Sequence, residues 1–123
     1  MTQRALIVVP RKVFKPKRIN TLSVSIPRYI LDFTEISPHE ELFCWSEGDK
    51  VAFSTEGKEG VLMQRVKLRA VSRYKDREYY MLTIPMRFAR ELGIKKGDYV
   101  LLAIGKRHLY VMKYLREKIE LLE

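Results

Sequence analysis

The sequence predicts a mainly β protein with short helices, built from two similar units that pack into a small barrel with pseudo-two-fold symmetry. Short runs of β-branched and aromatic residues, separated by turn residues, recur along the chain and indicate short strands. A strand-like run that ends in Ile-Pro and passes into a short amphipathic segment occurs twice, at Ile26-Pro27 and at Ile84-Pro85. A unit of about 50 residues buries little apolar surface alone, so the repeat predicts two units that share one core.

The second copy of the pattern shows how its strands are predicted. Basic residues alternate with apolar ones over residues 65–70, which indicates a strand with one basic face. The polar stretch Ser72–Glu78 predicts a turn, and residues 79–84 predict the next strand. Pro85 ends that strand because proline has no N–H for the ladder, and it suits the first position of a helix.

The helix predicted after Pro85 has Phe88 and Leu92 at helical spacing on one face. Gly93 should stop it, because glycine adopts the left-handed conformation of a helix end without steric cost. The remaining elements predicted for this copy are strands over residues 99–104 and 109–113 and a short C-terminal helix over residues 114–123.

The first copy aligns with the second when the sequence is shifted by 58 residues. This shift superimposes Ile26-Pro27 on Ile84-Pro85 and Arg11 on Arg69. The elements predicted for the first copy are strands near 6–15, 20–26, 40–46 and 50–55 and a helix near 28–33, which no glycine ends. We therefore expect a first, degenerate unit over 1–55, a linker over 56–64, a second unit over 65–113, and then the C-terminal helix.

Charge points to an anionic partner. The 123 residues carry a formal net charge of +9, and the basic residues form two clusters, over residues 1–31 and 65–90. Acidic residues collect instead between Asp32 and Glu59. An excess of positive charge on this scale attracts polyanions such as nucleic acids at long range.

Composition disfavours several other classes of protein. Cys44 is the single cysteine, and His39 and His108 fall in predicted turns, so neither a disulfide nor a metal site is expected. We expect no enzyme and no cofactor, because neither a catalytic set nor a glycine-rich phosphate loop is apparent. No apolar stretch approaches the roughly 18 residues of a membrane helix. We expect a cytoplasmic, nucleoid-associated protein, and its scarcity of Asn and Gln is typical of thermophilic sources.

The stretch TIPMRFARELGIKKGDYVLL, residues 83–102, resembles the signature of the AbrB/SpoVT swapped-hairpin DNA-binding domain. The resemblance covers residues 65–113, and it extends to residues 6–55 through Ile26, Pro27, Ile36 and Pro38. It implies an intertwined two-unit barrel that binds duplex DNA as a transcription regulator or as an antitoxin. Two chains usually supply the two units, whereas one chain carries both here, an arrangement similar to MraZ-type members of the family.

We predict a duplex-DNA-binding transcription regulator whose basic strand faces and helix-start arginines contact phosphates. The residues predicted to bind DNA are Arg11, Lys15, Lys17, Arg18 and Arg28 in the first unit and Arg69, Arg73, Lys75, Arg77, Arg87 and Arg90 in the second. One alternative is an antitoxin or other protein-interaction module that docks a toxin or another partner through residues 114–123. Another is an architectural or single-stranded nucleic-acid binder that stacks bases on strand aromatics. Self-association into a homo-oligomer also remains open.

Overall fold

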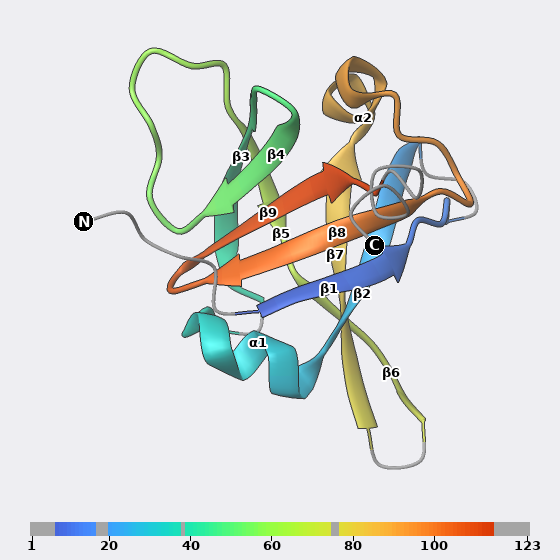
Figure 1. The fold of residues 1–123 in the computed structure, drawn as a ribbon. Helices are drawn as coiled ribbons and strands as arrows, with labels where there is room; N and C mark the ends of the chain where they lie inside the picture. Colours follow the sequence, from blue (N-terminus) through green and yellow to red (C-terminus); the bar gives the residue numbers. More distant parts are fainter. Residues whose placement is uncertain (1–6, 17–19, 38, 75–76, 115–123) are drawn as a thin grey trace, which may run out of the picture.

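The computed structural model describes residues 7–16, 20–37, 39–74 and 77–114 (Figure 1). The elements, in chain order, are β1 (Ile7–Lys12), β2 (Thr21–Pro27), α1 (Arg28–Thr34), β3 (Glu41–Glu47), β4 (Lys50–Ser54), β5 (Gln64–Lys67), β6 (Arg69–Tyr74), β7 (Arg77–Pro85), α2 (Met86–Leu92), β8 (Tyr99–Gly105) and β9 (His108–Lys113). The prediction of a mainly β protein with short helices is confirmed. The C-terminal helix predicted over residues 114–123 lies outside the described residues, apart from Tyr114.

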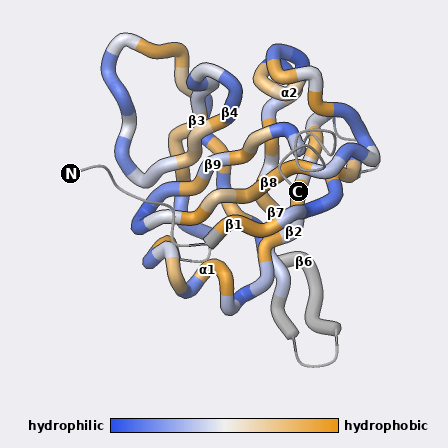
Figure 2. The backbone as a smooth tube through the Cα atoms, in the orientation of Figure 1, coloured by the Kyte–Doolittle hydropathy of each residue, from blue (hydrophilic) through white to orange (hydrophobic). Residues whose placement is uncertain are grey.

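The strands form two antiparallel sheets. The larger sheet has six strands in the order β1-β8-β9-β4-β3-β5, and the smaller has three in the order β2-β7-β6. The core lies between them, where alternate residues of facing strands, such as Val24, Leu82, Phe53 and Leu109, are fully buried. Figure 2 shows hydrophobic residues concentrated along the strands and hydrophilic ones in the connecting loops.

The strand register repeats with the 58-residue offset seen in the sequence. Helix α2 begins and ends 58 residues after α1, and β8 begins and ends 58 residues after β3. In the β2–β7 pair, Val24 lies opposite Leu82, and in the β4–β9 pair, Ala52 lies opposite Tyr110. Both pairs join residues 58 positions apart, so in each pair a residue of the first unit lies opposite its own equivalent in the second. This is the register that a pseudo-two-fold axis through the two pairs produces.

The first strand of each predicted unit pairs with a strand of the other predicted unit. β1 from the first unit pairs with β8 of the second, and β5 from the second unit pairs with β3 of the first. The chain then crosses to the smaller sheet at Val13 in one unit and at Leu68 in the other, and both side chains are buried. Neither unit therefore contains a complete sheet of its own.

The predicted match of Arg11 with Arg69 is wrong. Arg11 lies opposite Val100, and the residue opposite the equivalent Leu42 is Val66, so the first strands repeat at an offset of 55. The second unit has three more residues than the first between its first strand and the strand that ends in Pro85. The β6–β7 hairpin, which belongs to the smaller sheet, contains these residues and projects beyond the six-stranded sheet (Figure 1).

The predicted turn over Ser72–Glu78 is also shorter than expected, because β6 continues to Tyr74 and β7 begins at Arg77. Arg73 lies opposite Glu78 in the register of this hairpin. Strand pairing is made by backbone N–H and C=O groups, so a polar run extends a ladder as readily as an apolar one where no core face is needed. The polarity of residues 72–78 alone therefore predicted a turn that is too long.

The barrel expected from the resemblance is not closed. The six-stranded sheet ends at β1 on one side and β5 on the other, and the three-stranded sheet ends at β2 and β6. At the β1 side, one bridge among the described residues, between Phe14 and Ser23, joins the sheets. Among the described residues this seam has no continuous ladder of the kind that closes a barrel.

Candidate nucleic-acid interface

Helix α2 presents two arginines to solvent. Phe88 and Ala89 turn into the core, at 2% and 0% exposed, which leaves Arg87 and Arg90 on the outer face of this short helix. The helix ends at Gly93, which has the left-handed φ of 71° and donates its N–H to the carbonyl of Arg90 at 3.1 Å. The Arg87 guanidinium lies 6.0 Å from the Phe88 ring centroid.

The loop after α2 adds two exposed lysines, Lys95 and Lys96. Its conformation is held by Asp98, whose carboxylate accepts the Lys95 N–H at 2.9 Å, and by the Asp98 N–H, which donates to the Lys95 carbonyl at 3.0 Å. Two further hydrogen bonds of 2.8 Å attach this loop to Val13, from Val13 N–H to Asp98 and from Gly97 N–H to Val13. The loop is thereby fixed beside the end of β1.

A hollow of about 650 Å³ lies where the loop meets the end of β1. Its lining includes the basic residues Arg11, Lys12 and Lys96 and the apolar side chains of Phe14 and Tyr99. Arg11 donates through Nε to the Ser25 carbonyl at 2.9 Å and through Nη2 to the Ser25 hydroxyl, which sets the direction of its guanidinium. We call the hollow together with Arg87, Arg90, Lys95 and Lys96 the α2 end.

The corresponding surface at α1, residues 28–41, which we call the α1 end, has a different character. Tyr29 and Asp32 occupy the positions equivalent to Arg87 and Arg90, and Tyr29 is 66% exposed. Residues 28–41 contain one base and four acids, a net charge of −3, whereas residues 86–99 contain four bases and two acids, a net charge of +2. Figure 1 places the two helices at opposite ends of the molecule.

All four acids of residues 28–41 are already paired with cations. Asp32, Glu35, Glu40 and Glu41 lie 3.3 to 3.8 Å from a basic side chain. The cations in these pairs are Arg28, Lys106, Arg107 and Arg65. Among the described residues no ion pair engages the four bases of residues 86–99. Of the two helix segments, the one at α2 therefore carries the bases that have no ion pair among the described residues.

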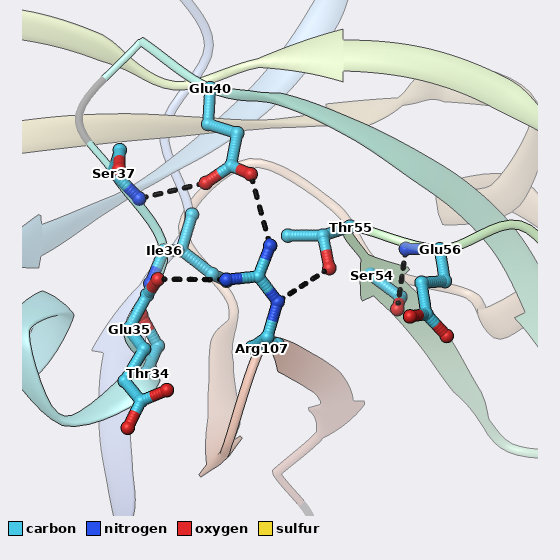
Figure 3. Close-up of polar contacts among 9 residues, drawn as sticks. All are labelled: Thr34, Glu35, Ile36, Ser37, Glu40, Ser54, Thr55, Glu56 and Arg107. Carbon is cyan, nitrogen blue, oxygen red and sulfur yellow. Dashed lines mark hydrogen bonds and ion pairs between the residues drawn. The ribbon is translucent and has the colours of Figure 1, made fainter.

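Arg107 is the centre of the pairing at the α1 end (Figure 3). It comes from the β8–β9 turn, and its guanidinium reaches the Glu40 carboxylate at 3.3 Å, the Thr55 hydroxyl at 3.2 Å and the Glu35 carbonyl at 3.4 Å. Its backbone N–H donates to the Thr34 carbonyl at the end of α1. This arginine from the second unit thus holds three segments of the first.

The predicted DNA-binding residues fall into several groups. Arg87, Arg90, Lys15 and Arg69 are exposed, whereas Arg11 is half-buried against Ser25. Arg28 donates to Asp32 at 3.4 Å and to the Tyr80 hydroxyl at 2.9 Å, so it is engaged within the protein. Lys17, Arg18 and Lys75 lie outside the described residues, and the side chains of Arg73 and Arg77 are likewise not described.

Sequence reasoning missed Lys12, Lys95 and Lys96 as members of the candidate site, and it did not distinguish Tyr99 from the other strand aromatics that could stack on bases. Lys12 directly follows Arg11, and the two other lysines are adjacent and precede the Gly-Asp turn. A pair of neighbouring basic residues was therefore the sequence signal for each part of the site. Their convergence depends on the pairing of β1 with β8, in which Lys12 lies opposite Tyr99. Those strands are far apart in the sequence, and the pairing has no local signal.

Strand aromatics are mostly packing residues. Trp45 is 7% exposed and Tyr80 is 3% exposed, whereas Tyr99 is 52% exposed. Cys44 is fully buried, and this burial raises the pKa of its thiol. No three His, Cys, Asp or Glu side chains among the described residues are grouped as a metal site would need. Within the same residues, no helix has the length and apolarity to cross a membrane.

Comparison of the chain with protein-family models, with curated protein sequences and with solved structures found no match.

Proposed function

We propose that the chain is a duplex-DNA-binding transcription regulator that contacts DNA through the α2 end. The observation that carries this proposal is the unequal distribution of unpaired positive charge. Arg87, Arg90, Lys95 and Lys96 are exposed and make no ion pair with the described residues, whereas the acids at the α1 end are all paired. Exposed cations without acidic partners are the groups that bind phosphates and release counterions from DNA.

The resemblance to AbrB/SpoVT domains supports the same proposal. Strand exchange between the units and the pseudo-two-fold register are features that an intertwined pair of such domains would have. Helix α2 follows the Ile-Pro of β7, and Arg90 stands at a position that is often arginine in that family. In the first unit Asp32 holds this position, so we assign the duplex contact to the second unit.

In the proposed complex, the arginines of α2 contact phosphates on one strand, and the lysines of the following loop extend the contact along the backbone. Phosphate contacts position the protein without reading the bases. Arginine side chains that reach base edges, or the ease with which the duplex deforms, would supply the sequence preference.

A titration of fluorescent 20-base-pair duplex DNA at about 50 and 200 mM salt tests the proposal. Removing two phosphate contacts in the double variant Arg87→Ala/Arg90→Ala should weaken binding by roughly tenfold or more and reduce the salt dependence by about two counterions. The matched control is Tyr29→Ala/Asp32→Ala, which changes the equivalent positions of α1 and should leave DNA affinity within about twofold. Thermal melts verify that both variants fold.

Equal weakening by the two double variants would contradict the assignment to the α2 end. Absence of duplex binding by the unaltered protein at 50 mM salt would contradict the proposal itself. The second candidate, a protein-interaction module, would then lead, because Tyr29 and Phe33 form an exposed aromatic pair on α1, at 66% and 52%. The antitoxin alternative depended on residues 115–123, which lie outside the described residues.

A further inference from the structure

The hollow at the α2 end has a lining that combines cationic and planar apolar groups. Arg11, Lys12 and Lys96 contribute three positive charges, and none of the described residues that line the hollow is acidic. Pro10, Phe14 and Tyr99 contribute its apolar part. At about 650 Å³ it falls in the range of volumes that small-ligand sites occupy. A ligand that matches this lining carries an anionic group and a flat apolar group side by side.

The walls of the hollow are built before any ligand arrives. Val13 and the loop that contains Gly97 are joined by two backbone hydrogen bonds of 2.8 Å, and the Lys95–Asp98 turn is closed by two more. The Arg11 guanidinium is directed by its two hydrogen bonds to Ser25. A preformed site loses less conformational entropy on binding than a flexible surface does.

The position of Tyr99 relative to Lys12 defines how such a ligand would lie. The two residues are directly opposite in the β1–β8 register, so their side chains project from the same face of neighbouring strands. Tyr99 is 52% exposed although it lines the hollow, so its ring has a face open to solvent. An aromatic ring beside a cation suits a base stacked on tyrosine with its phosphate on lysine.

We propose that this hollow binds a nucleotide unit, with the phosphate held by Lys12 and Lys96 and the base stacked on Tyr99. The ligand chemistry is a phosphate that carries an aromatic base. A free nucleoside monophosphate and a nucleotide of an unpaired nucleic-acid strand share that chemistry. The proposal shares Lys96 with the proposed duplex contact but uses neither Arg87 nor Arg90, so the two proposals can be tested separately.

Isothermal titration calorimetry of the full chain with AMP, GMP, CMP and UMP tests this proposal at about 50 mM salt. At least one monophosphate should bind more tightly than inorganic phosphate and than its own nucleoside. Tyr99→Ala should weaken that binding at least fivefold, because stacking on an aromatic side chain supplies part of the affinity. Lys96→Gln should weaken it and lower its salt dependence.

Matched controls come from the pseudo-symmetric surface. Glu41→Ala changes the residue equivalent to Tyr99, and Lys106→Gln removes a surface lysine at the α1 end, so neither should alter nucleotide affinity. Tyr99, Lys96 and both control residues are exposed, so their variants should fold, which thermal melts check.

Two competition experiments distinguish the sources of the ligand. A single-stranded oligonucleotide that displaces the monophosphate, with both weakened by Tyr99→Ala, would assign the hollow to unpaired strands. A monophosphate that binds while the oligonucleotide does not compete would assign it to free nucleotides, and either result supports the proposal. Binding of every monophosphate no tighter than inorganic phosphate, or unchanged binding in Tyr99→Ala, would overturn it. The Arg87→Ala/Arg90→Ala variant should weaken duplex binding but retain nucleotide binding. Failure of the duplex proposal is therefore distinguishable from failure of the nucleotide proposal.

Discussion

At the scale of single residues, Arg107 joins a costly backbone conformation to several useful side-chain contacts. Its φ of 60° lies in the left-handed region, which costs a residue with a Cβ roughly 1 kcal/mol. The guanidinium offsets that cost by binding Glu40, Thr55 and the Glu35 carbonyl. No sequence pattern announced this role, because the partners lie 52 to 72 residues away along the chain.

Two substitutions separate these contributions. Arg107→Ala should lower the free energy of unfolding by about 1 kcal/mol, because it removes partly exposed hydrogen bonds and keeps the left-handed backbone. Arg107→Gly loses the same contacts but relieves the backbone, so it should be more stable than Arg107→Ala by about 0.5–1 kcal/mol. Urea unfolding measures both. The neighbouring Lys106→Ala should change stability by less than about 0.5 kcal/mol, and equal stabilities of the alanine and glycine variants would contradict the backbone argument.

At the scale of elements, the two helices show how one position accommodates different sequences. Both begin directly after a proline and end with a residue in the left-handed conformation, Gly93 with φ 71° and Glu35 with φ 59°. Only glycine adopts this conformation without steric cost, so α1 is the less favourable of the two. The outer faces also differ, with aromatic and acidic residues on α1 and arginines on α2.

Glu35→Gly should therefore stabilise the protein by about 0.5–1 kcal/mol, because it removes the steric cost at the end of α1. The lost ion pair with Lys106 is 3.8 Å long and exposed, so it contributes little. The measurement is the free energy of unfolding in urea, with Glu35→Ala as the control that loses the same ion pair but keeps a Cβ. A glycine variant no more stable than the alanine variant would show that the helix end is not strained.

At the scale of the whole molecule, the two units depend on each other. β1 pairs with β8, β5 with β3, β2 with β7 and β4 with β9, and each of these pairs joins one unit to the other. An isolated unit would expose both the edges and the apolar faces of its strands, which favours association. The whole chain should consequently unfold in one cooperative transition.

The pseudo-two-fold register makes a specific prediction for a fragment of residues 56–123. Leu82 lies opposite Val24, its equivalent in the first unit, and Tyr110 lies opposite Ala52, its equivalent there. Two copies of the fragment can therefore pair with each other through the same strands as the two units do. We expect a homodimer with strand content by circular dichroism, and light scattering coupled to gel filtration gives its mass. A folded monomeric fragment would contradict the mutual dependence of the units.

The sequence by itself determined the local elements and their repetition. Strand runs, Ile-Pro switches, the Gly93 stop and the 58-residue offset are written in short-range patterns of polarity and backbone preference. The structure agrees with the two switches, with the Gly93 stop and with the offset of 58 between α1 and α2 and between β3 and β8. The basic character of the second unit, including Arg87 and Arg90, was also evident from charge alone.

Only the tertiary structure decided which charges are free and which residues meet. Pairing of β1 with β8 brings Lys12 to Tyr99, and the β8–β9 turn brings Arg107 to Glu40. The extra residues of the β6–β7 hairpin shifted the first strands to an offset of 55, and the two sheets do not close into a barrel. These outcomes depend on long-range register, which follows from packing of the whole core and leaves no trace in neighbouring residues.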